Sequence, residues 1–334
     1  MASALALVSS SLFLTFLSSS SSSSSAELLR FEHPTKHDGS LSLIVVGDWG
    51  RKGECNQSQV AKQTAWPESK TRPSRSPSPT STRPRVFRSN VLGNHDYRGD
   101  VLAQLSPVLR KIDSRWLCLR SFILQTEIAD FFFVDTTPFV LKYWRRPKDH
   151  HYDWREVSPR NQYINTLLQD LDGALKESIA PWKFVVGHHT MRSVSKHGDT
   201  EELLEKLLPV LKEHGVDIYI NGHDHCLEHI SSKDSSIQYL TSGGGSNAWR
   251  GTYTPNDDEL QFFYDGQGFM AMEVMAASVK IKFYDVFGQV QRAEFNKALR
   301  YVYQAKNREM RISRVEEKEK GRNAEDRQIG RVRR

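Results

Sequence analysis

Short apolar runs that end in glycine and polar residues recur along the chain and predict buried strands. The first is Leu41–Val46, which Gly47-Asp48-Trp49-Gly50 stops. An apolar run followed by glycine and polar residues is typical of a buried strand that leads into a polar loop. Further strands are expected at Arg120–Ile123, Asp130–Asp135, Lys183–Val186, Val216–Ile220, Ile237–Thr241, Gly268–Val274 and Val279–Val286.

Two segments between these strands carry apolar residues at helical spacing. Ser158 and Pro159 are expected to open the first helix, as N-cap and first helical residue. Its apolar positions are Ile164, Leu167, Leu168, Leu171 and Leu175. Strands alternate with helices early in the chain and pair directly later, which predicts an α/β fold with a mixed sheet system flanked by helices.

The second helix is expected to begin after Asp199, with Glu202 completing a capping box. Its apolar positions are Leu203, Leu204, Leu207, Leu208 and Leu211. We expect Pro209 to kink this helix, because proline removes a backbone hydrogen bond, and Gly215 to end it.

Charge and composition set two segments apart from the rest. Residues 67–85 hold five Pro, five Ser and four Arg without apolar periodicity, so we expect them to be disordered. Residues 296–334 carry 13 Lys/Arg against 6 Asp/Glu and read as a basic tail. The 334-residue chain has a net charge of +6, and the part outside 66–88 and 296–334 carries −6. This distribution argues against a nucleic-acid binder with a basic core.

The first 26 residues read as a secretory signal peptide. An apolar run of about 14 residues, too short to span a bilayer, precedes a Ser-rich stretch that ends at Ala26. We therefore expect cleavage before Glu27, a domain over 27–295, no transmembrane segment, and secretion to the cell exterior, wall or vacuole. Export would make Asn56, in Asn-Gln-Ser, a candidate glycosylation site. The three cysteines, Cys55, Cys118 and Cys226, form no metal-type CxxC pair.

Polar residues follow four of the apolar runs, where strands are expected to end. They are Asp48, then Asn94 and His95, then His188 and His189, then His223 and His225. Any one of them alone is typical of a turn or a cap. Together they indicate one cavity, because ligands gather at the carboxyl ends of strands in α/β sheets. Carboxylate, amide and imidazole groups without thiolate suit hard or borderline metal ions.

The motifs GDWG, GNHD, VVGHH and GHDH, in this order, resemble the metallophosphoesterase signature, particularly that of the low-molecular-weight plant purple acid phosphatases. Flanking text such as YRGD, DFFFVDTTPFV and TSGGGSNAWRG extends the resemblance over residues 31–63 and 90–295. It implies a four-layer α/β/β/α sandwich, an acid phosphatase that hydrolyses phosphate monoesters, and a dinuclear centre of Fe(III) with a divalent Fe, Zn or Mn ion.

The resemblance also implies a role for each motif residue. Asp48 and His225 would bind the ferric ion, whereas the divalent ion would be bound by Asn94, His188 and His223. His95 and His189 would orient phosphate and assist the leaving group. In such centres the metals lower the pKa of bound water for in-line attack by hydroxide.

One block of the family is missing from this sequence. The family carries GDxxY between GDWG and GNHD, where its Asp bridges the metals and its Tyr binds Fe(III). Here no Gly-Asp pair and no Tyr occur between Asp48 and Tyr97. The ferric site would keep two protein ligands and the divalent site three. We therefore expect the loss of one core strand and a poorly folded, colourless and weakly active chain, through either an altered reading frame or splice, or a divergent loop.

Three other functions stay open at this level. The chain could be an inactive protein that binds one metal or phosphate, which the missing bridge favours. It could be a metallophosphodiesterase. The basic tail could attach to nucleic acid or membrane, although we expect phosphate monoesters as partners and no nucleic acid. The sequence leaves the oligomeric state open.

Overall fold

A computed structural model describes residues 27–296 apart from 51, 53, 65–87, 146–149, 257 and 289, with no side chains described beyond 288. The expected signal peptide, the segment 67–85 and nearly all of the basic tail lie outside the described residues. None of the helices in the described part of the chain has the length and apolar character that crossing a membrane requires.

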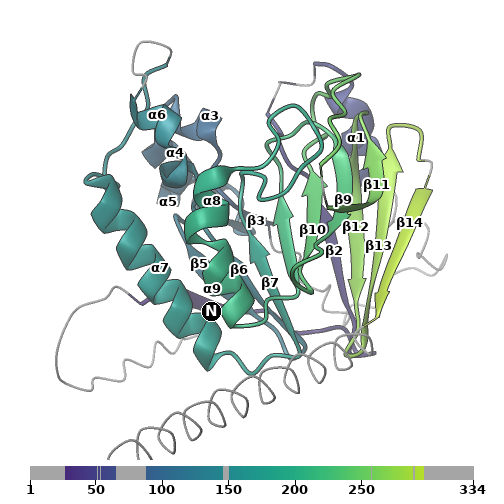
Figure 1. Cartoon of the computed structure of the whole chain (residues 1–334), viewed down its shortest axis with the longest axis horizontal. Coiled ribbons are helices and arrows are strands. Elements are labelled where there is room, and N and C mark those ends of the chain that lie inside the picture. Colours follow the sequence, from purple (N-terminus) through teal and green to yellow (C-terminus); the bar gives the residue numbers. More distant parts are fainter. Residues whose placement is uncertain are drawn as a thin grey trace, which may run out of the picture.

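A sheet of eight strands, in the order β1-β5-β6-β7-β8-β10-β9-β11, forms the centre of the molecule (Figure 1). The strands are β1 (Leu29–Glu32), β5 (Phe122–Gln125), β6 (Ala129–Phe133), β7 (Trp182–Val186), β8 (Ile218–Asn221), β9 (Leu227–Ser231), β10 (Gln238–Ser242) and β11 (Glu259–Tyr264). Strands β6, β7, β8 and β10 are parallel neighbours, so their carboxyl ends meet at one edge.

A smaller antiparallel sheet packs against the large one. Its order is β14-β13-β12-β2, with β2 at Leu41–Val45, β12 at Gly268–Val274, β13 at Ser278–Asp285 and β14 at Val290–Asn296. Alternate residues of β13, namely Val279, Ile281 and Phe283, are buried in the core between the sheets, as the two-residue period of a strand requires. Strands β3 (Arg88–Asn90) and β4 (Trp116–Cys118) form a separate parallel pair.

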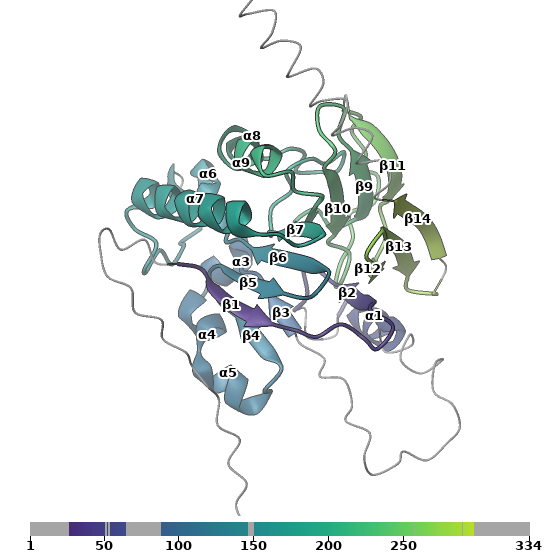
Figure 2. The ribbon, with the colours of Figure 1, turned by 90° about the horizontal axis from the view of Figure 1, so that it is seen from below.

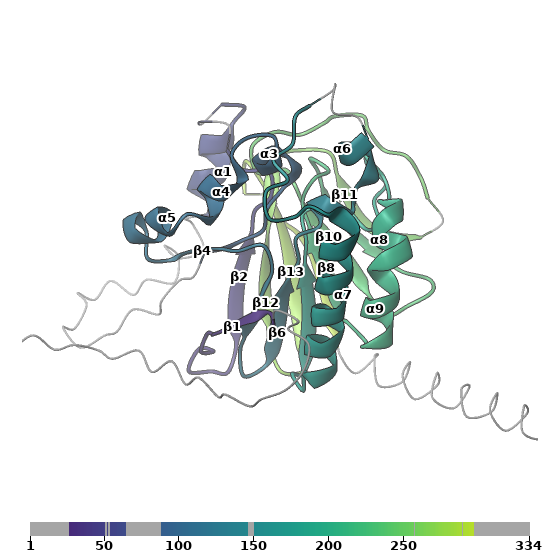
Figure 3. The same cartoon turned by 90° about the vertical axis from the view of Figure 1, so that its left-hand side faces the viewer.

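Helices lie on both sides of the two sheets. Figure 3 shows α7 (Arg160–Glu177), α8 (Glu201–Lys206) and α9 (Leu208–Glu213) on one side, and α1 (Gln57–Thr64), α4 (Val101–Leu105) and α5 (Pro107–Ile112) on the other. The view from below in Figure 2 shows the same division. The short helices α3 (Asn94–Tyr97), η1 (Thr137–Phe139) and α6 (Leu141–Arg145) complete the described set. The predicted α/β sandwich is confirmed.

Both predicted helices form, but their caps differ from the expectation. Helix α7 begins at Arg160 with Pro159 as its N-cap. Thr200, not Asp199, is the N-cap of α8, and no side chain caps it. Glu202 makes no capping box because its carboxylate accepts the backbone N–H of Leu141 at 2.7 Å. A contact with a residue distant in the sequence therefore uses the carboxylate that the local sequence pattern assigned to the helix cap.

The break in the second helix is confirmed. The helix divides at Leu207 into α8 and α9, and Pro209 lies in the first turn of α9. Gly215, with a φ of 60°, follows the end of α9 in the left-handed conformation that glycine adopts at low cost.

The expected loss of a core strand stays a prediction. Among the described residues, β2 pairs only with β12 and β3 pairs only with β4. Residues 65–87, which separate α1 from β3 in the sequence, lie outside the described part of the chain.

Candidate metal centre

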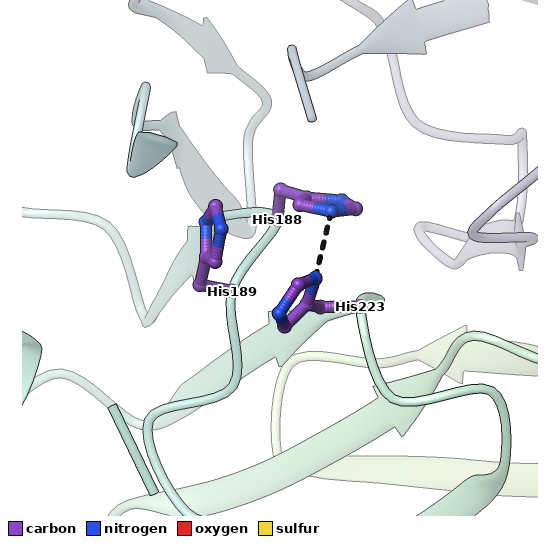
Figure 4. A group of neighbouring side chains, drawn as sticks. All are labelled: His188, His189 and His223. Carbon is purple, nitrogen blue, oxygen red and sulfur yellow. Dashed lines mark hydrogen bonds between the residues drawn. The ribbon is translucent and has the colours of Figure 1, made fainter. Parts of the chain in front are cut away.

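Three histidines meet where the parallel strands β7 and β8 end (Figure 4). His188 and His189 follow β7, and His223 follows β8. The ligand atoms that these three residues offer all lie within 4.8 Å of one another. The loops are held together by the backbone N–H of Gly222, which donates to the carbonyl of His188 at 3.1 Å.

Asn94, at the start of α3, completes a group of three donors with His188 and His223. Nε2 of His188 lies 3.0 Å from Oδ1 of Asn94 and 3.3 Å from Nδ1 of His223. Burial lowers the pKa of both histidines and so favours the neutral ring, which is the form that binds metal. Gly93 is required here, because a Cβ at this position would lie 2.8 Å from Cε1 of His188.

Asp48 and His225 form a second group beside the first. Oδ1 of Asp48 lies 3.5 Å from Nε2 of His225, and Oδ2 accepts the backbone N–H of His223 at 2.7 Å. Burial alone would raise the pKa of Asp48, but the hydrogen bond with His225 and the nearby His188 hold it below its ordinary value. Asp48 and His223 have positive φ angles of 53° and 69°. Strained conformations of this kind cluster at functional sites.

His189 lies against these groups, and both of its ring nitrogens are already hydrogen bonded. The hydroxyl of Thr136 accepts the backbone N–H groups of His188 and His189, which leaves its proton for Nδ1 of His189 at 3.0 Å. Nε2 of His189 lies 3.2 Å from the hydroxyl of Tyr143, which also interacts with Asn94. His189 therefore has no ring nitrogen free for a metal in this arrangement.

His95 is exposed next to the buried donors. Partial burial and the charge of Arg98 lower its pKa, and the charges of Asp48 and His188 also act on it. The structure therefore brings all seven predicted site residues to one edge of the sheets, where Asn94, His188 and His223 form the tighter group.

A further histidine at the site, His197, was missed by the sequence reasoning. Its ring stacks on His223 with centroids 4.2 Å apart and meets Trp249 edge-on at 5.1 Å. Trp249 in turn stacks on His225 at 4.0 Å. His197 follows no strand, so the strand-end argument could not reach it; the pair His197-Gly198 in the loop before α8 was the available signal.

A buried hydrogen-bonded network supports the helix that carries Asn94. The hydroxyl of Tyr97 donates to Asp135 and accepts from Arg120 at 2.7 Å, and Tyr163 of α7 also donates to Asp135 at 3.0 Å. Burial raises the pKa of Asp135 to about 6, although these hydrogen bonds act to lower it. Tyr97 thus fixes α3 three residues beyond Asn94.

The donor set fits a divalent metal ion. One amide oxygen and two neutral imidazoles converge in the first group, which matches an open three-ligand site. The second group offers one carboxylate and one imidazole among the described residues. Between Asp48 and Asn94 the sequence contains no further Tyr, His or Asp that could add a ligand.

Comparisons with known proteins agree with this geometry. The calcineurin-like phosphoesterase family profile matches residues 39–227. The chain is 50% identical to Purple acid phosphatase 17 of Arabidopsis thaliana, over 85% of this chain and 93% of that protein. It is 52% identical to Purple acid phosphatase 3 of the same plant, over 80% of each chain.

A solved structure shares the fold at low sequence identity. It is described as "GAP50 the anchor in the inner membrane complex of Plasmodium", with a TM-score of 0.56 and 21% identity over 77% of this chain and 89% of that one.

Proposed function

Because the chain belongs to the calcineurin-like phosphoesterase family and, within it, to the purple acid phosphatases, we propose that it is a metal-dependent acid phosphatase that hydrolyses phosphate monoesters at the site around His188 and His223. The observation that carries the proposal is the convergence of Asn94, His188 and His223 at distances of 3.0 and 3.3 Å. Three of the four family motifs contribute a residue to this group.

Each side chain has a role that follows from its position. Asn94, His188 and His223 would hold the divalent ion, and Asp48 and His225 would hold the ferric ion of a dinuclear centre. Bound metal supplies charge that stabilises the phosphate and lowers the pKa of water. His95 and His197 stand at the solvent side of the donors, where they can orient a phosphate and assist the leaving group. For His189, the predicted role is still to orient the phosphate.

The second metal position is incomplete, so we propose that activity is impaired. Asp48 and His225 are two donors, and no Tyr occurs in the sequence between Asp48 and Tyr97. Without a tyrosine ligand to Fe(III), the purified protein should lack the purple colour of the family. The same deficit supports a second candidate, a protein that binds one metal or phosphate without turnover.

Secretion belongs to the proposal as well. The N-terminal sequence motivates it, and Asn56 is exposed, as a glycan acceptor must be. A mass increase that a glycosidase removes from the secreted protein, and that Asn56→Gln abolishes, would support both points. A cytosolic, unmodified protein would contradict them.

The test is hydrolysis by the full chain supplied with Fe and Zn. The proposal predicts slow release from p-nitrophenyl phosphate at acid pH, little from bis-p-nitrophenyl phosphate, and none in His223→Ala. As a matched control, His214→Ala changes a histidine of the α9 C-terminus, bonded to Asp172 away from the site, and should keep activity. Metal binding without turnover would favour the binding protein. Faster hydrolysis of the diester would favour the phosphodiesterase. A chain that neither binds metal nor hydrolyses either substrate would overturn the proposal.

A further inference from the structure

A buried carboxyl group outside the metal site anchors the loop of residues 193–198, which precedes α8. Asp224 lies between His223 and His225 in the sequence, but its side chain points into the protein and is completely buried. Oδ2 accepts the hydroxyl of Ser193 at 2.7 Å, and Oδ1 accepts the backbone N–H of His197 at 2.9 Å. Both partners belong to the loop that carries the His197 ring.

A second buried acidic side chain supports the same loop. Glu228, on β9, accepts the backbone N–H of Val194 at 2.7 Å. The hydroxyl of Ser193 also accepts the backbone N–H of Ser195 at 3.0 Å, which tightens the turn above Asp224. Burying acidic groups is costly unless hydrogen bonds compensate. Here three donors, from Ser193, Val194 and His197, come from one short stretch, and Thr241 adds a longer contact to Glu228 at 3.3 Å.

The contacts made by His197 show what this anchoring achieves. Its ring stacks on His223, and the two planes are inclined by 17°. His223 and Asp224 are adjacent, so the residue that offers a metal donor and the residue that anchors the loop lie on one strand-end turn. The side chains of these two residues have different partners, so removing the Asp224 carboxyl group frees the loop and leaves the metal donor of His223 in place.

We propose that Asp224 is a positioning residue: it fixes the 193–198 loop so that the His197 ring stays stacked over His223 at the mouth of the metal site. The effect on phosphate hydrolysis rests on the proposed function above. The anchoring itself does not, because it is a property of the protein without metal.

The experiment compares Asp224→Ala with Asp224→Asn in the full chain. Asparagine keeps an oxygen that accepts the His197 N–H and gains an NH2 group that can donate to the Ser193 hydroxyl oxygen. Alanine removes both contacts. The control is Asp130→Ala, a buried carboxylate bonded to Ser178 at the opposite end of β6. The first readout is the ring-proton chemical shift of His197 in histidine-labelled protein, assigned with His197→Ala, because the ring stacked on His223 and the edge-on ring of Trp249 both displace this shift.

The expected result is that Asp224→Ala moves the His197 signals toward those of a histidine without ring contacts, while Asp224→Asn and Asp130→Ala leave them in place. In the second readout, kcat/KM for p-nitrophenyl phosphate falls by about 10- to 100-fold in Asp224→Ala, as for other residues that orient a metal site, and zinc affinity is unchanged.

Unmoved His197 signals in Asp224→Ala, or an equal movement in Asp130→Ala, would overturn the proposal. An equal loss of zinc affinity would also overturn it, because the role would then be structural. If Asp224→Ala does not fold, Ser193→Ala removes one of the two contacts and must give an intermediate shift. If the parent chain hydrolyses nothing, the proposed function fails, and the His197 signals still decide the anchoring.

Discussion

The buried hydroxyl of Tyr97 donates a hydrogen bond to the carboxylate of Asp135, which joins the helix that carries Asn94 to the end of β6. Tyr163, on α7, donates to the same oxygen of Asp135 at 3.0 Å. The two tyrosines thus make the same chemical contact from different elements, and only one of those elements bears a metal donor.

This arrangement predicts different outcomes for Tyr97→Phe and Tyr163→Phe. Either change leaves Asp135 with one donor fewer, so each should lower the free energy of unfolding by about 1–3 kcal/mol in urea. Only Tyr97→Phe should also weaken zinc binding, because it loosens α3. Equal zinc affinities in the two variants would show that α3 does not depend on this contact.

Gly93→Ala should displace His188. A Cβ at position 93 would lie 2.8 Å from Cε1 of the His188 ring, closer than real Cβ contacts come. We expect zinc affinity to fall by at least about tenfold, the lower end of the effect of disturbing a residue that orients a ligand. Gly173→Ala is the control: the position lies inside α7 with nothing within 4 Å of an added Cβ, and the change should stabilise the protein by about 0.5–1 kcal/mol. Equal zinc affinity in Gly93→Ala and the parent would refute the contact.

His188→Ala and His189→Ala should differ in metal binding. Both histidines follow β7 and both are buried. His189, however, uses its two ring nitrogens on Thr136 and Tyr143, whereas Nε2 of His188 faces Asn94 and His223. Zinc binding measured by competition with a chromophoric chelator should be lost in His188→Ala and largely kept in His189→Ala. The reverse order would mean that His189 is the ligand.

Glu228 should make the metal-free protein less stable as the pH rises. Burial raises the pKa of its carboxyl to about 8, and Asp224 acts in the same direction. A group whose pKa is raised on folding adds stability that is complete below its ordinary pKa, 4.5, and is lost as the pH rises through about 8. Glu228→Gln removes the ionisation and should match the parent in Tm near pH 4.5 and exceed it at pH 8. Parallel Tm curves would contradict this assignment.

The sequence predicted the parts of the fold in which each element carries its own signal. The runs Lys183–Val186 and Ile237–Thr241 became β7 and β10, since both contain buried aromatic and β-branched residues, which are enriched in strands. Strand β9 (Leu227–Ser231) was missed because it contains Glu228 and His229. Both are buried, and residues of other elements satisfy them: the backbone N–H of Val194 donates to Glu228 at 2.7 Å, and Oε1 of Gln238 on β10 lies 2.7 Å from Nε2 of His229.

The candidate site was predicted as far as it follows strand ends. Asp48, His188 and His223 come directly after strands, so the topology alone brings them together. His197 could not be found this way, because it reaches the site through a loop that Asp224 holds from inside the protein. The hydrogen bonds that anchor such a loop join residues far apart in the sequence, so no local sequence pattern predicts them.

The most direct test of the whole account is a calorimetric titration of the full chain with zinc in parallel with His223→Ala and His225→Ala. The account predicts one tight zinc ion per chain, bound by Asn94, His188 and His223, lost in His223→Ala and retained in His225→Ala. Two equally tight ions per chain, or loss of the tight ion in His225→Ala, would contradict it.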